Sequence, residues 1–122
     1  MESLSKCLWR WGMVMLSLPL ITALLCASFY WRARWSLGYA PSYGNPDPKQ
    51  LDWPVHQSLV MLGLVFLLPA MLSSFCLGGV LVYRREKLRG QVCMMLSVLI
   101  FGVFVLLGKV QVVGEFMAWI LD

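Results

Sequence analysis

Few polar side chains in this sequence have the type and spacing that chemistry needs. His56 is the single histidine, and it stands at the start of a long apolar run, where it could ligate a haem together with a group from another chain. The ordinary alternative is a polar residue at a membrane boundary. Asp47 and Asp52 lie five positions apart on a proline-rich segment, so they do not form the rigid carboxylate pair that acid–base catalysis requires. We therefore expect no catalytic residue, no bound cofactor and no enzyme activity.

The cysteines do not indicate a metal or redox site. Cys7, Cys26, Cys76 and Cys93 are far apart, and no two have the CxxC spacing that is typical of zinc and thiol chemistry. Cys26 and Cys76 lie inside apolar runs, where a cysteine usually acts as a small apolar residue. We expect no metal site in this chain.

Lys109 and Glu115 are the only charged side chains placed for a role within a membrane-spanning segment. They could line a proton or ion path. Counted from Gln91, however, Lys109 is 18 positions along the chain, which is ~27 Å of helix and already the far boundary of a bilayer. A lysine that extends its ammonium group to the membrane surface is the simpler interpretation.

The composition indicates what must position these residues. Of 122 residues, 60% are hydrophobic and 13% are charged, and the mean hydropathy is +0.75. Soluble domains average about 45–50% apolar and about 25% charged residues, and a chain this short has too little interior to bury the excess. These values exclude a soluble globular domain, a disordered tail and a disulfide-rich secreted module, and they indicate a protein solvated by lipid.

Three segments are long and apolar enough to cross a bilayer as helices. They cover residues 11–31, 57–83 and 91–108, and each has at least 18 residues without a formal charge. The first is expected to be retained and not cleaved as a signal, because Leu25 stands where cleavage after Ala27 needs a small residue. The sequence therefore predicts an all-α integral membrane protein with three transmembrane helices in a single membrane domain, residues 1–122.

The basic residues predict an orientation. Six of them would lie on one side of the membrane and four on the other, which places the N-terminus and the turn at residues 84–90 on the cytoplasmic or matrix side. We expect the four basic residues of that turn to contact lipid headgroups or a partner; they are Arg84, Arg85, Lys87 and Arg89. The tryptophans are expected to anchor the helix ends at the boundaries; they are Trp9, Trp11, Trp31, Trp35, Trp53 and Trp119.

Besides the N-terminal segment and the basic turn, two longer segments lie outside the predicted spans. Residues 32–56 contain four prolines and are expected to form an irregular outer loop, in which Tyr39, Tyr43 and Trp53 are candidates for contact with a partner. Residues 109–122 carry apolar side chains at helical spacing. This C-terminal extension either continues the third helix or bends and lies as an amphipathic helix in the membrane interface.

Small residues predict close helix packing. Ala70, Ser74 and Gly78 recur every four positions in the second span, and Ala23 and Ala27 do so in the first. Such spacing allows two helix backbones to approach closely in lipid. We expect these residues to face another helix, either of this chain or of a partner.

These features favour a small non-enzymatic integral membrane subunit that packs against larger integral membrane subunits and stabilises or helps to assemble their complex. Its other partners would be membrane lipids and not nucleic acid, in a bacterial inner membrane or an organellar membrane. One alternative is a homo-oligomeric transport or pore-forming protein with Lys109, Gln111 and Glu115 at one end. A second alternative is a cofactor-anchoring subunit of an electron-transfer complex with His56 as a ligand. No motif in the sequence selects one protein family.

Overall fold

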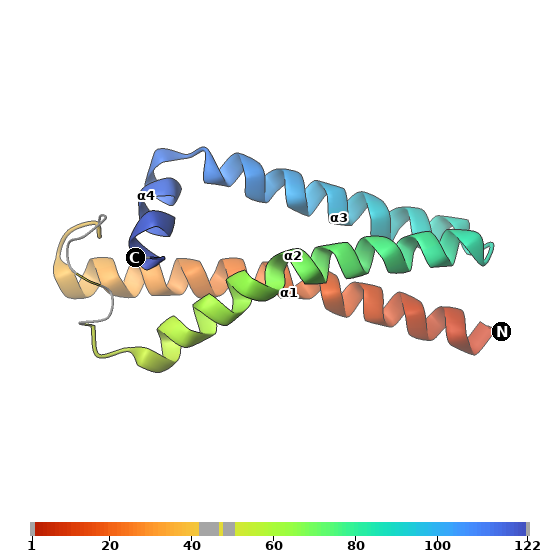
Figure 1. The fold of residues 1–122 in the computed structure, drawn as a ribbon, viewed down its shortest axis with the longest axis horizontal. Helices are drawn as coiled ribbons and strands as arrows, with labels where there is room; N and C mark the ends of the chain where they lie inside the picture. Colours follow the sequence, from red (N-terminus) through yellow and green to blue (C-terminus); the bar gives the residue numbers. More distant parts are fainter. Residues whose placement is uncertain (1, 42–46, 48–50, 122) are drawn as a thin grey trace.

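The computed structural model describes residues 2–41, 47 and 51–121, and the described part is helical with no strand. The elements are α1 (Glu2–Leu37), α2 (Pro54–Tyr83), α3 (Lys87–Gly108) and α4 (Gln111–Ile120). Helices α1, α2 and α3 are each long and apolar enough to cross a membrane. They form an elongated bundle, and the short α4 lies across the end opposite the N-terminus (Figure 1).

Helix α1 is longer than the apolar run that predicts it. It has 36 residues and includes residues 32–37, which we expected in the irregular loop. No proline interrupts this part of the chain before Pro41, so the backbone hydrogen bonds continue. The helix ends at Leu37 and is followed by Gly38, whose positive φ of 76° suits glycine and whose N–H donates to the Arg34 carbonyl over 3.0 Å.

One face of α1 is buried along almost its full length, with a repeat of about 3.5 residues. This spacing is typical of helices that wrap around each other at a shallow left-handed angle. The bundle is thus built around α1, which packs mainly against α2. The buried positions are Ser5, Gly12, Leu16, Pro19, Thr22, Cys26, Phe29 and Ala33.

A tight turn joins α2 to α3. Arg85 has a positive φ of 67°, and its N–H donates to the Val82 carbonyl, while the Glu86 N–H donates to the Leu81 carbonyl, both over 3.0 Å. This is the Schellman arrangement, in which the two residues after the cap satisfy the last carbonyls of a helix. Because α3 begins immediately at Lys87, α2 and α3 form a close antiparallel hairpin.

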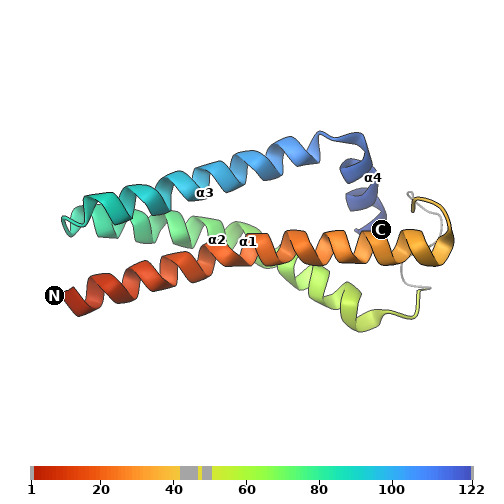
Figure 2. The same cartoon turned by 180° about the vertical axis from the view of Figure 1, so that it is seen from behind.

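Helix α3 diverges from α1 as it leaves the turn, and α4 folds back into the opening (Figures 1 and 2). The C-terminal extension therefore neither continues α3 nor points away from the bundle. Its Phe116, Trp119 and Ile120 are buried in one core cluster with Phe29 and Val60. Trp119, one of the tryptophans expected to anchor the helix ends, has no exposed surface and packs within this cluster.

Candidate functional site

The small residues of α2 lie in the centre of the three-helix contact. Ala70 is 4% exposed, and Ser74 is fully buried. The Ser74 hydroxyl donates to the backbone carbonyl of Gly12 in α1 over 3.2 Å, so the two helices meet closely enough for a side chain to reach a backbone. A Cβ atom at Gly12 would lie 3.0 Å from the Cys93 sulfur in α3, so α3 also packs closely at this position.

The backbones of α2 and α3 come close together at Gly78 and Gly90. A Cβ atom at Gly78 would lie 2.9 Å from the Gly90 carbonyl oxygen, and one at Gly90 would lie 2.6 Å from the Gly78 carbonyl oxygen. Neither position has room for a side chain. The spacing of Ala70, Ser74 and Gly78 predicts the α2 face of this contact, whereas Gly90 stands alone beside a basic turn and gave no such signal.

The small residues of α1 have a different environment. Ala23 and Ala27 line a groove of about 560 Å³ that is bordered by all four helices. Its lining is almost entirely apolar and includes Leu68, Phe104 and Val113. Ala27 is exposed, so no helix among the described residues covers this part of α1.

The groove continues onto a part of α3 that packs little against the other described helices. The buried residues of α3 are Gly90, Cys93 and Ser97, all in its first half. From Val98 to Gly108 no residue is buried. Large side chains are exposed around the helix there; they include Leu99, Phe101, Val103 and Leu106.

An aromatic cluster joins α1, α2 and α4 beside the groove. The Phe29 ring centroid lies 4.9 Å from that of His56, 5.8 Å from that of Trp119 and 5.9 Å from that of Trp53. The His56 Nε2 is 3.0 Å from the Ser28 hydroxyl, in a hydrogen bond whose direction depends on the ring tautomer. His56, predicted as a low-priority ligand, is thus engaged within the chain.

The candidates for partner contact in the outer loop have different environments. Tyr39 is 47% exposed. Trp53 is partly buried against the core, and the Arg32 guanidinium stacks over its ring at 4.4 Å. Tyr43 lies outside the described residues.

Lys109 and Glu115 lie where the chain bends from α3 to α4. Lys109 caps the end of α3, and its side chain is exposed. The Glu115 carboxylate accepts a hydrogen bond from the Gln111 amide over 2.9 Å, also at an exposed position. Both residues lie beyond the apolar part of α3, at the bend into α4. They therefore do not line a path along the helices.

The basic turn lies at the same end of the molecule as the N-terminus (Figure 1). Glu86 accepts from Arg89 over 3.3 Å and from the Ser5 hydroxyl over 3.3 Å, which ties the turn to α1. Arg84, Arg85 and Lys87 are exposed. This end therefore presents several cations to its surroundings.

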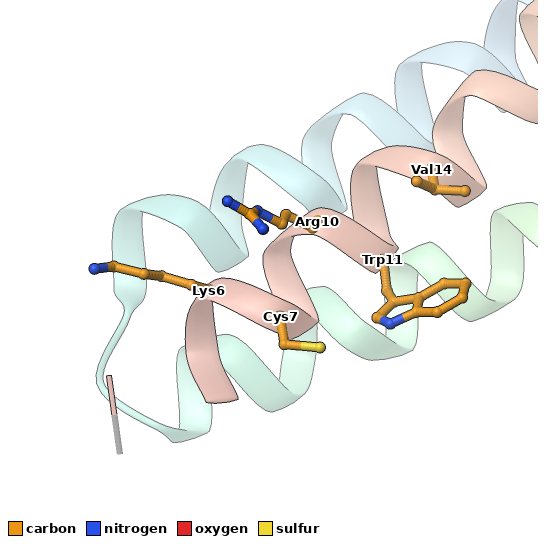
Figure 3. Close-up of a pocket in the computed structure, with 5 residues that line it drawn as sticks. All are labelled: Lys6, Cys7, Arg10, Trp11 and Val14. Carbon is orange, nitrogen blue, oxygen red and sulfur yellow. The ribbon is translucent and has the colours of Figure 1, made fainter. Parts of the chain in front are cut away.

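A hollow separate from the groove lies on α1, at the same end of the molecule as the basic turn. The sequence did not predict it. It has a volume of about 470 Å³ and is lined by Lys6, Cys7, Arg10, Trp11 and Val14. Lys6 and Arg10 leave the helix on one side, and Cys7 and Trp11 leave it on the other (Figure 3). Lys6 and Arg10 are one helical turn apart in the sequence, and this spacing is the signal that could have indicated the hollow. On their own, the two basic residues predict only the membrane orientation.

Within the residues that the structure describes, no three histidine, cysteine or acidic side chains are grouped so that they could hold a metal ion. The fold and these surfaces define a class: an all-helical chain with three helices apolar enough to cross a membrane. Comparison with protein-family models, curated proteins and solved structures finds no match to this chain.

Proposed function

We propose that this chain is a small non-enzymatic subunit of an integral membrane complex, and that it packs against larger membrane-spanning partners and stabilises or helps to assemble them. The observation that carries the proposal is the groove of about 560 Å³ together with the largely exposed second half of α3. Both are apolar, and α1, α2 and α3, which border the groove together with α4, are long enough to span a bilayer.

The groove suits a partner helix because its lining is apolar and includes the small residues Ala23 and Ala27 of α1. Helices associate in lipid chiefly through close van der Waals packing, which small side chains permit. Ala23 and Ala27 lie one turn apart at the groove and leave the α1 backbone accessible from that side. A partner helix would bury the exposed face of α3 at the same time.

The two alternative functions receive less support from the geometry. An ion path needs polar side chains along the helices, whereas Lys109 and Glu115 lie together at one corner, with Glu115 bonded to Gln111. For the haem-ligand role, the His56 ring packs edge-on against Phe29 at 4.9 Å and its Nε2 lies 3.0 Å from the Ser28 hydroxyl, so no observation favours that role over a packing role within the chain. We therefore retain the subunit role as the proposal.

The test is to fill the groove without disturbing the fold. Ala27→Phe places a ring in the groove, and Ala118→Phe makes the same change at an exposed position of α4 outside the groove lining. We expect an affinity-tagged A27F chain, purified in mild detergent, to recover about tenfold less of its membrane-spanning partners, since overpacking costs about 1–3 kcal/mol. The A118F chain should recover them as the unmodified chain does.

Two results would contradict the proposal. One is equal recovery of partners by the A27F and A118F chains, with both showing an unchanged thermal unfolding midpoint. The other is a purified single-component oligomer of this chain that transports a solute in liposomes, which would establish the pore-forming alternative.

A further inference from the structure

We infer that a hollow at the end of α1 away from the basic turn binds the phosphate group of one membrane phospholipid, with Arg32 as the donor. We name it the Arg32 hollow. This inference rests on the membrane location within the proposed function, and it needs no protein partner.

The Arg32 hollow is formed by two parts of the chain that are distant in the sequence. It has a volume of about 580 Å³. The last turns of α1 supply four of its lining residues, and the residue that precedes α2 supplies the fifth; they are Trp31, Arg32, Trp35, Ser36 and Trp53. The hollow therefore depends on the packing of α1 against the start of α2.

The buried core holds the arginine in place. The Phe29 ring, which has no exposed surface, contacts the Trp53 ring edge-on, with the two centroids 5.9 Å apart. The Arg32 guanidinium carbon in turn lies 4.4 Å from the centroid of the Trp53 ring. A guanidinium stacked on an aromatic ring contacts it through its flat face. Its N–H groups lie in the plane of that face, so they remain available to bind an oxyanion.

Arg32 has no anionic partner within the described residues. Its side chain forms no hydrogen bond or ion pair there, and no carboxylate is among the residues that line the hollow. Asp52, next to Trp53, also forms no ion pair in the described part of the chain, and Arg34 adds a second positive charge to α1. Because the planar fork of a guanidinium matches two oxygens of a phosphate group, the hollow offers a preoriented donor pair for phosphate.

The surroundings of Arg32 indicate a phospholipid as the source of that phosphate. Three of the five lining residues are tryptophans, and indole rings prefer the level between headgroups and acyl chains. Trp31 and Trp35 are 57% and 84% exposed, so both present apolar ring surface beside Arg32. A phospholipid has a phosphate and an apolar part at this level, whereas a free phosphate ion has nothing to contact these rings.

The experiment measures protection at the hollow itself. The two exposed cysteines, Cys7 and Cys76, are replaced by serine, and Ser36→Cys supplies a thiol at the hollow whose rate of modification by maleimide is measured. The full-length protein is held in dodecyl maltoside, which contains no phosphate. It is titrated with dioleoyl phosphatidylglycerol, dioleoylglycerol or inorganic phosphate. Each rate is divided by the rate of the same variant without addition, so that a change of charge near the thiol does not alter the readout.

We expect phosphatidylglycerol to slow the modification, and we expect dioleoylglycerol and inorganic phosphate at the same concentration not to slow it. Arg32→Gln should raise the phosphatidylglycerol concentration for half-maximal protection about tenfold, the effect of charge-assisted hydrogen bonds at an exposed position. Arg34→Gln is the matched control, because it removes the same charge from the same helix at a residue that does not line the hollow. It should leave that concentration within about threefold.

Equal shifts in the two variants would overturn the inference, since they would indicate only a diffuse positive surface. Equal protection by dioleoylglycerol would show that the phosphate is not recognised, and equal protection by inorganic phosphate would show that a lipid is not its source. Arg32 and Arg34 are exposed, so both variants should fold, which an unchanged unfolding midpoint checks. The membrane location is tested separately by resistance to carbonate extraction. A chain that resists extraction but gains no protection from phosphatidylglycerol refutes this inference alone.

Discussion

At the scale of single residues, the contact between α2 and α3 depends on the absence of side chains. A Cβ atom added at either Gly78 or Gly90 would lie within 3 Å of the carbonyl oxygen of the other glycine. Backbone cannot move aside as the tip of a long side chain can, so a larger residue must separate the helices. Such separation costs dispersion contacts that adjoining lipid replaces only in part.

Gly78→Leu should therefore destabilise the helix hairpin, by about 1–3 kcal/mol if the helices shift to accept the extra volume. The measurement is the unfolding midpoint of the purified protein in detergent. Gly79→Leu is the matched control, because a Cβ atom at Gly79 meets nothing within 4 Å. Leucine also has a higher helix propensity than glycine, so the control should be as stable as the parent or slightly more so. Equal destabilisation by the two changes would refute the close contact.

At the scale of elements, the turn between α2 and α3 places arginine where glycine is usual. Arg85 has a φ of 67°, and the left-handed conformation costs an L-residue about 1–2 kcal/mol. Arg85→Gly should raise the stability by about 0.5–1 kcal/mol, since part of the relief is lost to the greater freedom of the unfolded chain.

Arg84→Gly provides the comparison for that change. Arg84 has a φ of −79°, which any residue adopts readily, so glycine there should give no stabilisation. Chemical unfolding of both variants in detergent distinguishes them. If Arg85→Gly destabilises the protein more than Arg84→Gly does, then the arginine side chain contributes more to the turn than its backbone conformation costs.

Helix α4 is attached to the bundle by its buried aromatic face. Trp119 is fully buried and contacts both Phe29 and Phe116, so Trp119→Ala should cost about 3–5 kcal/mol and release α4. Faster proteolysis within residues 109–121 would report the release. Trp35→Ala is the matched control, because Trp35 is 84% exposed, and it should leave the proteolysis unchanged. Equal protection of α4 in both variants would show that this contact does not retain the helix.

At the scale of the whole molecule, the ends of the bundle differ in charge, and this predicts its orientation. The N-terminus and the α2–α3 turn lie at one end, and the end of α1 lies at the other (Figure 1). In a cysteine-replaced background, an impermeant maleimide should label Tyr39→Cys in intact cells or organelles. It should label Lys87→Cys only after the membrane is permeabilised. The reverse labelling pattern would invert the orientation.

The three long helices were predictable because uncharged runs of this length have few other stable states. The face of α2 that carries Ser74 and Gly78 was also predictable, since small residues at this spacing favour close contact. The position of α4 was not predictable from the sequence. Val112, Phe116 and Ile120 show that its helix has an apolar face, but periodicity does not specify which surface that face meets. The same limit applies to the groove, which exists only because α3 diverges from α1.

Because α4 packs back against α1, the parts of the chain must fold in a particular order. The α2–α3 hairpin closes over a turn of a few residues, so its contacts form at small entropic cost. Phe29 and Trp119 are far apart in the sequence and meet only after the intervening segments have been placed. Until then the aromatic surface of α1 stays uncovered. We expect newly made chains to pass through a stage in which the hairpin has formed and Phe29 is still accessible, and at that stage a chaperone or protease can distinguish unfinished molecules from finished ones.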